Sequence, residues 1–406
     1  MPGLTLTPFA ALRHRNFRRF YIGQTISLVG TWMQQLAQGW LVLQLTDSAL
    51  WVGLVSFLNA LPILLFSLPA GAWVDRADKR RLVTACQALF LVNTALLTAL
   101  VATGVTQAWM VGAVALAGGC ISAVEIPARQ SFIVELVGKD DLTNAIALNS
   151  SAFNATRIVG PAIAGVLVAR VGLVSCFAIN VLTYVAVLVA LRGLDVAPTP
   201  RAVEGDNWQR LRDGLRYVRG EAHVLGLIVS TALLSLLAYP YVVLLPVFAR
   251  DVLRVGAEGL GVMSSAVGFG ALAAALGLAT LAPRVRRGRL VVLAGTSCGL
   301  AVAGFAYARW FPLAVLLLAA SGFAMVLNNA ATNTLLQSLV PDEMRGRVMA
   351  LWSLVFVGFA PLGSLQAGWL ATRIGPSAAV AVGALLAALL LSQMWRRVAP
   401  GVKALR

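Results

Sequence analysis

Two ionisable residues stand apart from every other charge in the sequence. Glu125, in the stretch GGCISAVEIPARQSF, and Arg157 each lie inside a long apolar run. An ionisable side chain at membrane depth is costly, so it is usually paired or functional. If the two runs form an antiparallel hairpin that turns near residue 139, Arg157 lies one helical turn deeper than the position opposite Glu125, within reach of a guanidinium. We therefore expect an ion pair between them.

Three roles are open to this predicted pair. It could neutralise itself and pin the two helices together. It could act as a proton-linked switch, because desolvation raises the pKa of a buried carboxyl and protonation of Glu125 would release Arg157. Finally, Glu125 could contact the substrate directly.

The elements that must position these residues are membrane helices. Of the 406 residues, 59% are hydrophobic and 12% are charged, and the mean hydropathy is +0.83, which is far outside the range of soluble domains. Apolar runs long enough to cross the bilayer as helices recur twelve times. They lie near residues 18–45, 50–74, 82–103, 108–130, 144–170, 174–192, 222–248, 258–281, 289–308, 312–337, 346–371 and 377–395.

The basic residues are distributed asymmetrically over the predicted loops. The net charge is +16, and if the N-terminus is cytoplasmic the inner segments carry 26 Lys and Arg against five in the outer loops. The positive-inside rule then predicts that both termini are cytoplasmic and that the basic charge faces anionic headgroups rather than nucleic acid. The four cysteines fall inside predicted spans at spacings that match no metal or redox motif, so we expect no metal site.

The chain divides into two similar halves. Residues 196–220 form the one long polar stretch, with a basic amphipathic run, and separate six-helix bundles at 1–195 and 221–406. AGAWVDRADKRRLV (70–83) matches residues 278–291 at a shift of 208, and RIVGPAIAGVLVARVG (157–172) matches the second half at a shift of 203, which indicates a parallel internal repeat. The second shift maps Glu125 to Asn328 and Arg157 to Ala360. The copy needs no charge there, which favours a proton-linked role over pinning.

Two like-oriented six-helix halves with basic loops resemble the major facilitator superfamily. GAWVDRADKRR is similar to the superfamily signature between helices 2 and 3, with Asp78 where a glycine is usual, and RIVGPAIAG resembles the Gly-Pro motif of antiporters. NFRRFYIGQTISLVGTWMQQLAQGWLVLQLTDSA and LVPDEMRGRVMAL resemble the bacterial subgroup of enterobactin exporters and macrolide and tetracycline efflux proteins. The resemblance implies an all-α membrane protein of twelve transmembrane helices in two pseudo-symmetric bundles, monomeric, in the bacterial cytoplasmic membrane.

The signature loop and its counterparts predict a cytoplasmic gate. Asp75 could face the N-terminal end of helix 11 or its arginines, although the cations of this loop could equally serve only to keep the loop inside. The predicted gate comprises Gly71, Asp75, Arg76, Lys79, Arg80, Arg284, Arg345 and Arg347, and the helix 5 motif comprises Gly160, Pro161 and Gly165. Arg129 is interpreted as a headgroup anchor at the end of helix 4.

Polar residues in helices 1, 7 and 10 predict a substrate cavity. A stripe on helix 1 shares one face, and polar glue between helices is the alternative to a water-filled lining. In the resembled fold, helices 1, 4, 7 and 10 line the cavity. The predicted lining residues are Gln24, Thr31, Gln35, Gln38, Tyr239, Asn328, Asn329 and Asn333, which suit an amphipathic, mostly uncharged or weakly cationic molecule.

The function predicted is secondary active export of an amphipathic drug or siderophore-like metabolite, with a proton gradient as energy source. No phosphate-binding loop is visible, and no cluster of acids or histidines for a membrane enzyme, so neither a nucleotide cofactor nor enzymatic activity is expected. The direction rests on the resemblance. The alternative is a facilitator or importer of a lipid-like or nutrient molecule.

Overall fold

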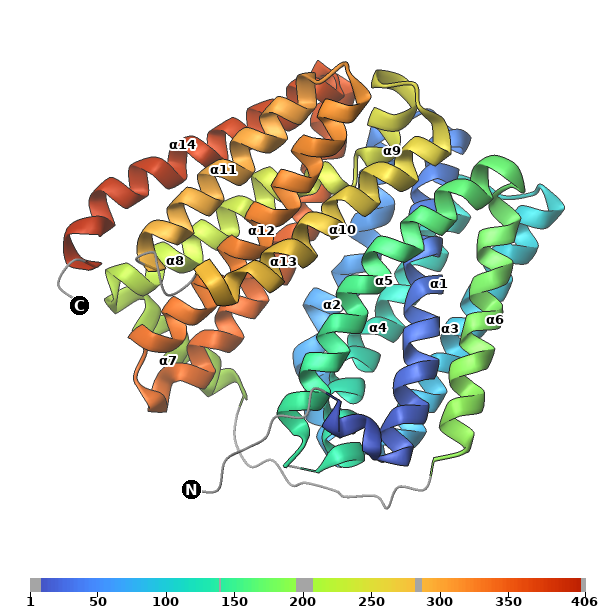
Figure 1. Ribbon diagram of the computed structural model, residues 1–406, viewed down its shortest axis with the longest axis horizontal. Coiled ribbons are helices and arrows are strands. Elements are labelled where there is room, and N and C mark those ends of the chain that lie inside the picture. Colours follow the sequence, from blue (N-terminus) through green and yellow to red (C-terminus); the bar gives the residue numbers. More distant parts are fainter. Residues whose placement is uncertain (1–8, 139, 195–206, 282–286, 403–406) are drawn as a thin grey trace. The chain divides into compact units, whose positions relative to one another are not determined.

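The computed structural model describes residues 9–138, 140–194, 207–281 and 287–402, and no strand occurs in these ranges. The chain forms a series of long helices (Figure 1). In the first half they are α1 (Arg15–Thr46), α2 (Ala49–Arg76), α3 (Lys79–Thr103), α4 (Ala108–Val137), α5 (Leu142–Arg170) and α6 (Leu173–Arg192), after a short 3₁₀ turn at Ala10–Arg13. In the second half they are α7 (Asn207–Gly220), α8 (Ala222–Leu233), α9 (Leu245–Val247), α10 (Gly256–Leu281), α11 (Arg287–Tyr307), α12 (Phe311–Leu339), α13 (Asp342–Ile374) and α14 (Pro376–Val402).

The predicted fold class is confirmed. Eleven of the described helical segments are long and apolar enough to cross a membrane. The twelfth is α1, which has 32 residues but carries the polar stripe that lowers its hydropathy. Within the described ranges the chain is thus an all-α, multi-pass membrane protein of twelve membrane helices, and α7 is the additional helix that contains the basic amphipathic run.

One predicted boundary differs from the structure in a way that changes the site. The apolar run predicts that helix 4 ends near residue 130, but α4 continues to Val137. The predicted helix ends near residue 130 because charged residues begin there, first Arg129 and then Glu135. Both charges are paired inside the bundle, so the helix tolerates them.

Two compact units divide the described chain. The first contains residues up to Gln38 and from Pro62 to the linker, and the second contains Gly39–Leu61 together with the C-terminal half. Within the first unit α3 packs against α4 and α6, and within the second α11 packs against α12 and α14. These are equivalent helices of the two halves, so the internal repeat reappears as a repeated packing arrangement.

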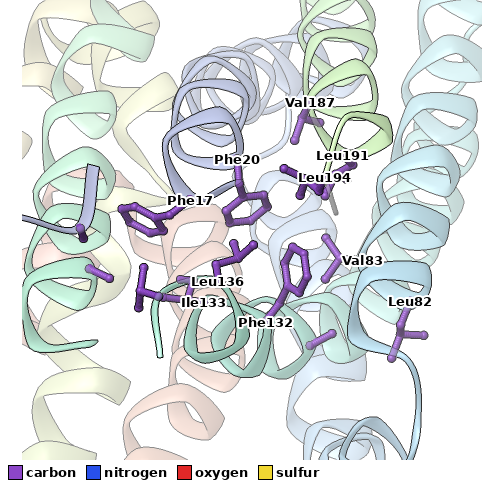
Figure 2. Packing of buried hydrophobic residues seen from close by; sticks show 14 of the residues in the cluster. Phe17, Phe20, Leu82, Val83, Phe132, Ile133, Leu136, Val187, Leu191 and Leu194 are labelled. Carbon is purple, nitrogen blue, oxygen red and sulfur yellow. The ribbon is translucent and has the colours of Figure 1, made fainter. Parts of the chain in front are cut away.

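Aromatic and branched side chains fill the core of the first unit near the start of α1. Figure 2 shows Phe20 of α1 directed toward Phe132 of α4, with Phe17 in the same cluster of buried side chains. The rings of Phe20 and Phe132 meet edge to face with centroids 5.4 Å apart, a geometry that aromatic pairs favour. In a bilayer such close packing, rather than exclusion of water, holds helices together.

The seventh membrane segment is irregular. It runs as α8, a π-helical turn at Leu234–Ala238, a 3₁₀ turn at Tyr239–Val242, α9 and a second π-helical turn at Phe248–Val252. Pro240 and Pro246 explain the breaks, because proline lacks the N–H that a continuous helix uses. The 3₁₀ turn is anchored by Tyr241, whose hydroxyl lies 2.7 Å from Ser321 Oγ of α12.

Candidate functional site

Glu125 is buried in the first unit and binds two side chains. Arg129, one turn further along α4, donates from Nε to Glu125 Oε1 at 2.8 Å, and Gln87 of α3 donates from Nε2 to the same oxygen at 3.3 Å. The side chains of Glu125 and Arg129 are only 8% and 12% exposed. With about 1.5 Å of rise per residue, Glu125 lies roughly 18 Å along the axis from the end of α4 at Val137. A buried, charged and hydrogen-bonded site is therefore present where the sequence singles out Glu125.

The partner of Glu125 was predicted wrongly. Arg129 holds the carboxylate, whereas the guanidinium carbon of Arg157 lies 5.8 Å from the centre of the Trp32 ring, a cation–π distance. The interpretation of Arg129 as a headgroup anchor is also wrong. It followed from the early predicted end of helix 4, since an arginine at a helix end would reach the interface.

A second ion pair lies two to three turns further along α4. Lys79, at the start of α3, places Nζ 3.8 Å from Glu135 Oε1, and the two side chains are 6% and 12% exposed. Lys79 also donates to the backbone carbonyl of Asp75 at 3.0 Å. Glu135 lies beyond the predicted end of helix 4 near residue 130, so the sequence did not predict this pair. The signal was available, because Glu135 follows Phe132, Ile133 and Val134 without a turn residue.

The repeat places an uncharged version of the first pair in the second unit. Asn328 of α12, the counterpart of Glu125, is buried and donates from Nδ2 to the carbonyl of Val291 in α11 at 2.7 Å. At the shift of 208 residues, Gln87 corresponds to Gly295. A Cβ atom at Gly295 would lie 3.1 Å from Asn328 Nδ2, so the glycine leaves room for the amide to reach the backbone. In both units this position bridges the same two equivalent helices.

The signature loop forms a tight, well-bonded turn. Asp78, which stands where the superfamily signature has glycine, is the N-cap of α3 and accepts from the backbone N–H of Arg81 at 3.0 Å. Arg80 donates to the carbonyl of Arg192 at 3.2 Å. Arg76 is exposed, Asp75 is half-buried, and a Cβ at Gly71 would meet open space. Among the predicted gate residues of this loop, Lys79 forms an ion pair with Glu135 inside the first unit.

The gate arginines at the start of α13, the eleventh membrane helix, have partners within the second unit. Arg345 bonds to Asp342 and donates from Nε to the carbonyl of Gln337 at 3.0 Å. Arg347 lies 3.3 Å from Asp213 of α7, beside Gly214, where an added Cβ would lie 3.2 Å from the Arg347 Cβ. Arg284 lies outside the described residues.

The helix 5 motif is a close helix crossing. A Cβ at Gly160 would lie 2.5 Å from the Cβ of Trp32 and 2.9 Å from the carbonyl oxygen of Val29, so only glycine allows α1 and α5 to approach this closely. Pro161 and Gly165 are buried on the same helix. The Trp32 ring lies edge to face with Phe153, 5.4 Å between centroids.

The residues of the polar stripe of α1 differ in how far they are exposed. Gln24 is buried, Gln38 is half-buried, and Thr31 and Gln35 are exposed. Beside the stripe lies a network that was not predicted from the sequence: Gln34 Oε1 accepts from Asn180 Nδ2 at 2.6 Å and from Thr94 Oγ1 at 3.0 Å. This network joins α1, α3 and α6, so these polar side chains hold helices together and do not line a water-filled cavity. Its signal was a lone amide in the otherwise apolar sixth span.

The polar residues of α12 and the seventh segment also differ in burial and in hydrogen bonding. Asn328 joins two helices, whereas Asn329 and Asn333 are half-buried, and Asn333 accepts from Gln337 at 2.6 Å. The hydroxyl of Tyr239 is buried and has no hydrogen-bond partner among the residues that the structure describes, and its ring lies edge to face with Phe356, 6.4 Å between centroids. No group of three or more His, Cys, Asp or Glu within the described ranges could hold a metal ion.

Comparisons with known proteins agree with this architecture. A sequence model of the family described as "Transmembrane secretion effector" matches residues 6–404. The chain is 26% identical to the Staphyloferrin A transporter of Staphylococcus aureus over 85% of this chain and 87% of that protein. It is 24% identical to the Enterobactin exporter EntS of Escherichia coli over 93% of this chain and 91% of that protein.

Solved structures show the same fold at low identity. The nucleoside transporter NupG superposes with a TM-score of 0.73 at 14% identity, covering 94% of this chain and 99% of that one. The D-xylose-proton symporter superposes with a TM-score of 0.71 at 14% identity, covering 93% and 97%. At these identities the likeness concerns the fold alone.

Proposed function

The chain belongs to the transmembrane secretion effector family of the major facilitator superfamily, and from this membership we propose that it is a secondary active transporter that exports an amphipathic, siderophore-like small molecule in exchange for protons. The coverage of both curated relatives exceeds four fifths of each chain. One of these relatives is a siderophore exporter by name and the other a siderophore transporter, which supports a secreted metal-chelating metabolite as the substrate class.

One observation carries the proton-coupling part of the proposal. The same helix-bridging position is a charged Glu125–Arg129–Gln87 cluster in the first unit and a neutral Asn328–Val291 hydrogen bond in the second. Since an amide suffices to bridge the helices, the carboxylate has a role beyond bridging. A buried carboxylate that can take up a proton is a common means of coupling in transporters.

The cluster would work as follows. Protonation of Glu125 neutralises the carboxylate and leaves Arg129 as a buried cation without its counter-charge, which is costly inside the bundle. The conformation that hydrates Arg129 is then favoured, and loss of the proton restores the pair. Proton binding thereby shifts the population of conformations rather than driving chemistry.

The test is Glu125→Gln in the purified transporter, reconstituted in vesicles with a citrate-type or catecholate siderophore as probe. The amide keeps the hydrogen bond with Gln87 but cannot take up a proton. We expect substrate binding and exchange of labelled for unlabelled probe to persist, while accumulation driven by a pH gradient is lost.

Glu135→Gln is the control for loss of a paired carboxylate in α4: we expect it to lower stability, because Lys79 loses its counter-charge, but to leave the response to the pH gradient intact. Uptake that still follows the pH gradient in Glu125→Gln would refute coupling at this site. In whole cells, higher retention of the probe on expression would refute export and favour the facilitator or importer. If Glu125→Gln does not fold, Glu125→Asp, which keeps the charge but shortens the side chain, should shift the pH dependence of transport.

A further inference from the structure

The hairpin formed by the end of α1 and the start of α2 does not pack with the rest of those helices. Residues Gly39–Leu61 belong to the second unit, whereas α1 before this point and α2 after it belong to the first. Both helices are continuous across the boundary. Any relative movement of the units must therefore bend α1 and α2 or detach the hairpin.

Glycines bring the hairpin into close contact with α13. A Cβ at Gly368 of α13 would lie 2.7 Å from the carbonyl of Ala49 and 3.3 Å from the Cα of Gly53. A Cβ at Gly53 would in turn collide with the carbonyl of Ser364. Small residues on facing helices permit such backbone contact without interlocking side chains. This contact can separate without any side chain having to be withdrawn.

A single arginine ties the hairpin to the seventh segment. Arg250 Nη1 donates to Asp47 Oδ1 at 2.6 Å and to the carbonyl of Leu43 at 3.0 Å. Its Nε and Nη2 donate to the two carboxylate oxygens of Asp251 at 2.6 and 3.2 Å. Asp251 thus orients the guanidinium, and the remaining donors reach across to the hairpin.

The hairpin end of this tie is shaped to receive a cation. Leu43 has one of the last carbonyls of α1, where the helix dipole favours positive charge. Asp47 adopts a left-handed conformation, φ 49°, in the two-residue turn between α1 and α2. Its side chain is 82% exposed, so water can replace Arg250 when the contact opens.

Each helix, although continuous, has a residue that permits bending where the hairpin joins the first unit. Gly39 marks the boundary in α1, and a Cβ there would lie 3.3 Å from Pro246 of the irregular seventh segment. Pro62 marks the boundary in α2 and removes one backbone hydrogen bond. Glycine and proline are the residues at which helices bend most readily.

We propose that Arg250 is a releasable latch, which holds the Gly39–Leu61 hairpin on the C-terminal unit and must let go of Asp47 and Leu43 for the transport cycle to proceed. The hairpin then bends about Gly39 and Pro62 and exposes the faces of α2 and α13 that now meet at Gly53 and Gly368. With the positive-inside orientation, this opening is on the outer side. The inference depends on neither the substrate nor the direction of transport.

The test measures opening directly. Ala49 is buried in the hairpin, so Ala49→Cys in a variant with Cys86, Cys120, Cys176 and Cys298 replaced gives a single reporter thiol. Intact cells are treated with a membrane-impermeant maleimide. We expect Arg250→Gln to raise the labelling rate about tenfold, because hydrogen bonds to charged groups are among the strongest in proteins.

Arg254→Gln is the matched control, since Arg254 is an exposed arginine four residues after Arg250, just beyond the end of the seventh segment. It should leave the rate unchanged. Asp47→Asn, which retains the Arg250–Asp251 contact, should raise the rate by less than Arg250→Gln does, and it decides the question if Arg250→Gln is not recovered folded. Rates within twofold of the parent in both variants, an equal effect of Arg254→Gln, or labelling only in inside-out vesicles would overturn the latch.

Discussion

Lys79 and Glu135 form a buried ion pair between the start of α3 and the end of α4, with Nζ 3.8 Å from Oε1. Removal of one partner leaves the other charge buried and uncompensated, which is more costly than removal of both. We expect Lys79→Met to lower the free energy of unfolding by about 3 kcal/mol, measured by thermal denaturation in detergent. The double variant Lys79→Met, Glu135→Leu should recover most of this loss; a double variant less stable than Lys79→Met alone would contradict the pairing.

The contact of Gly160 with α1 predicts a strict size limit. Gly160→Ala places a methyl group 2.5 Å from the Cβ of Trp32, so α1 and α5 must separate. Overpacking of this kind costs about 1–3 kcal/mol, and we expect a lower melting temperature and slower transport. Gly346→Ala is the control, because a Cβ there meets open space. Equal melting temperatures for the two variants would show that the crossing is looser than described.

Because Asn328 is uncharged, we expect its hydrogen bond between α12 and α11 to contribute to the stability of the second unit and not to proton coupling. Asn328→Ala removes the hydrogen bond to Val291 and leaves a buried carbonyl without its side-chain partner. Hydrogen bonds between membrane helices contribute about 0.6 kcal/mol on average and at most about 1.7, so a modest fall in melting temperature is expected. The pH dependence of transport should not change. A shifted pH profile would mean that the second unit also takes part in coupling.

Substitution of Asp75 should impair transport without impairing folding. Asp75 is half-buried at the end of α2, and its backbone carbonyl accepts from Lys79. Asp75→Asn keeps that backbone bond but removes the charge proposed to close the cytoplasmic side. We expect normal membrane insertion and a several-fold lower transport rate, with exposed Asp140→Asn as the control. Unchanged transport in Asp75→Asn would exclude the gate.

Much of the fold could be predicted from the sequence because the bilayer imposes it. A membrane helix must satisfy its backbone hydrogen bonds internally over a fixed thickness, so apolar length alone locates the spans. Most predicted ends lie within a few residues of the observed ones. The ends of α4 and α14 lie seven residues beyond the predicted ones. In α4 the reason is clear: a paired charge such as Glu135 can lie inside a helix that composition would end earlier.

The sequence by itself determined the class of the protein, its internal repeat and that Glu125 would need a partner, because a lone acid in an apolar run is costly wherever the helix points. Only the tertiary structure decided which cation pairs with that acid. Helix rotation and the true end of α4 turn Arg129 inward beside Gln87, while Arg157 lies over Trp32. It also decided that the Gly39–Leu61 hairpin belongs to the second unit. Which side chains pair depends on how each helix is rotated about its axis and where it crosses its neighbours. The spacing of residues along the sequence does not specify either of these.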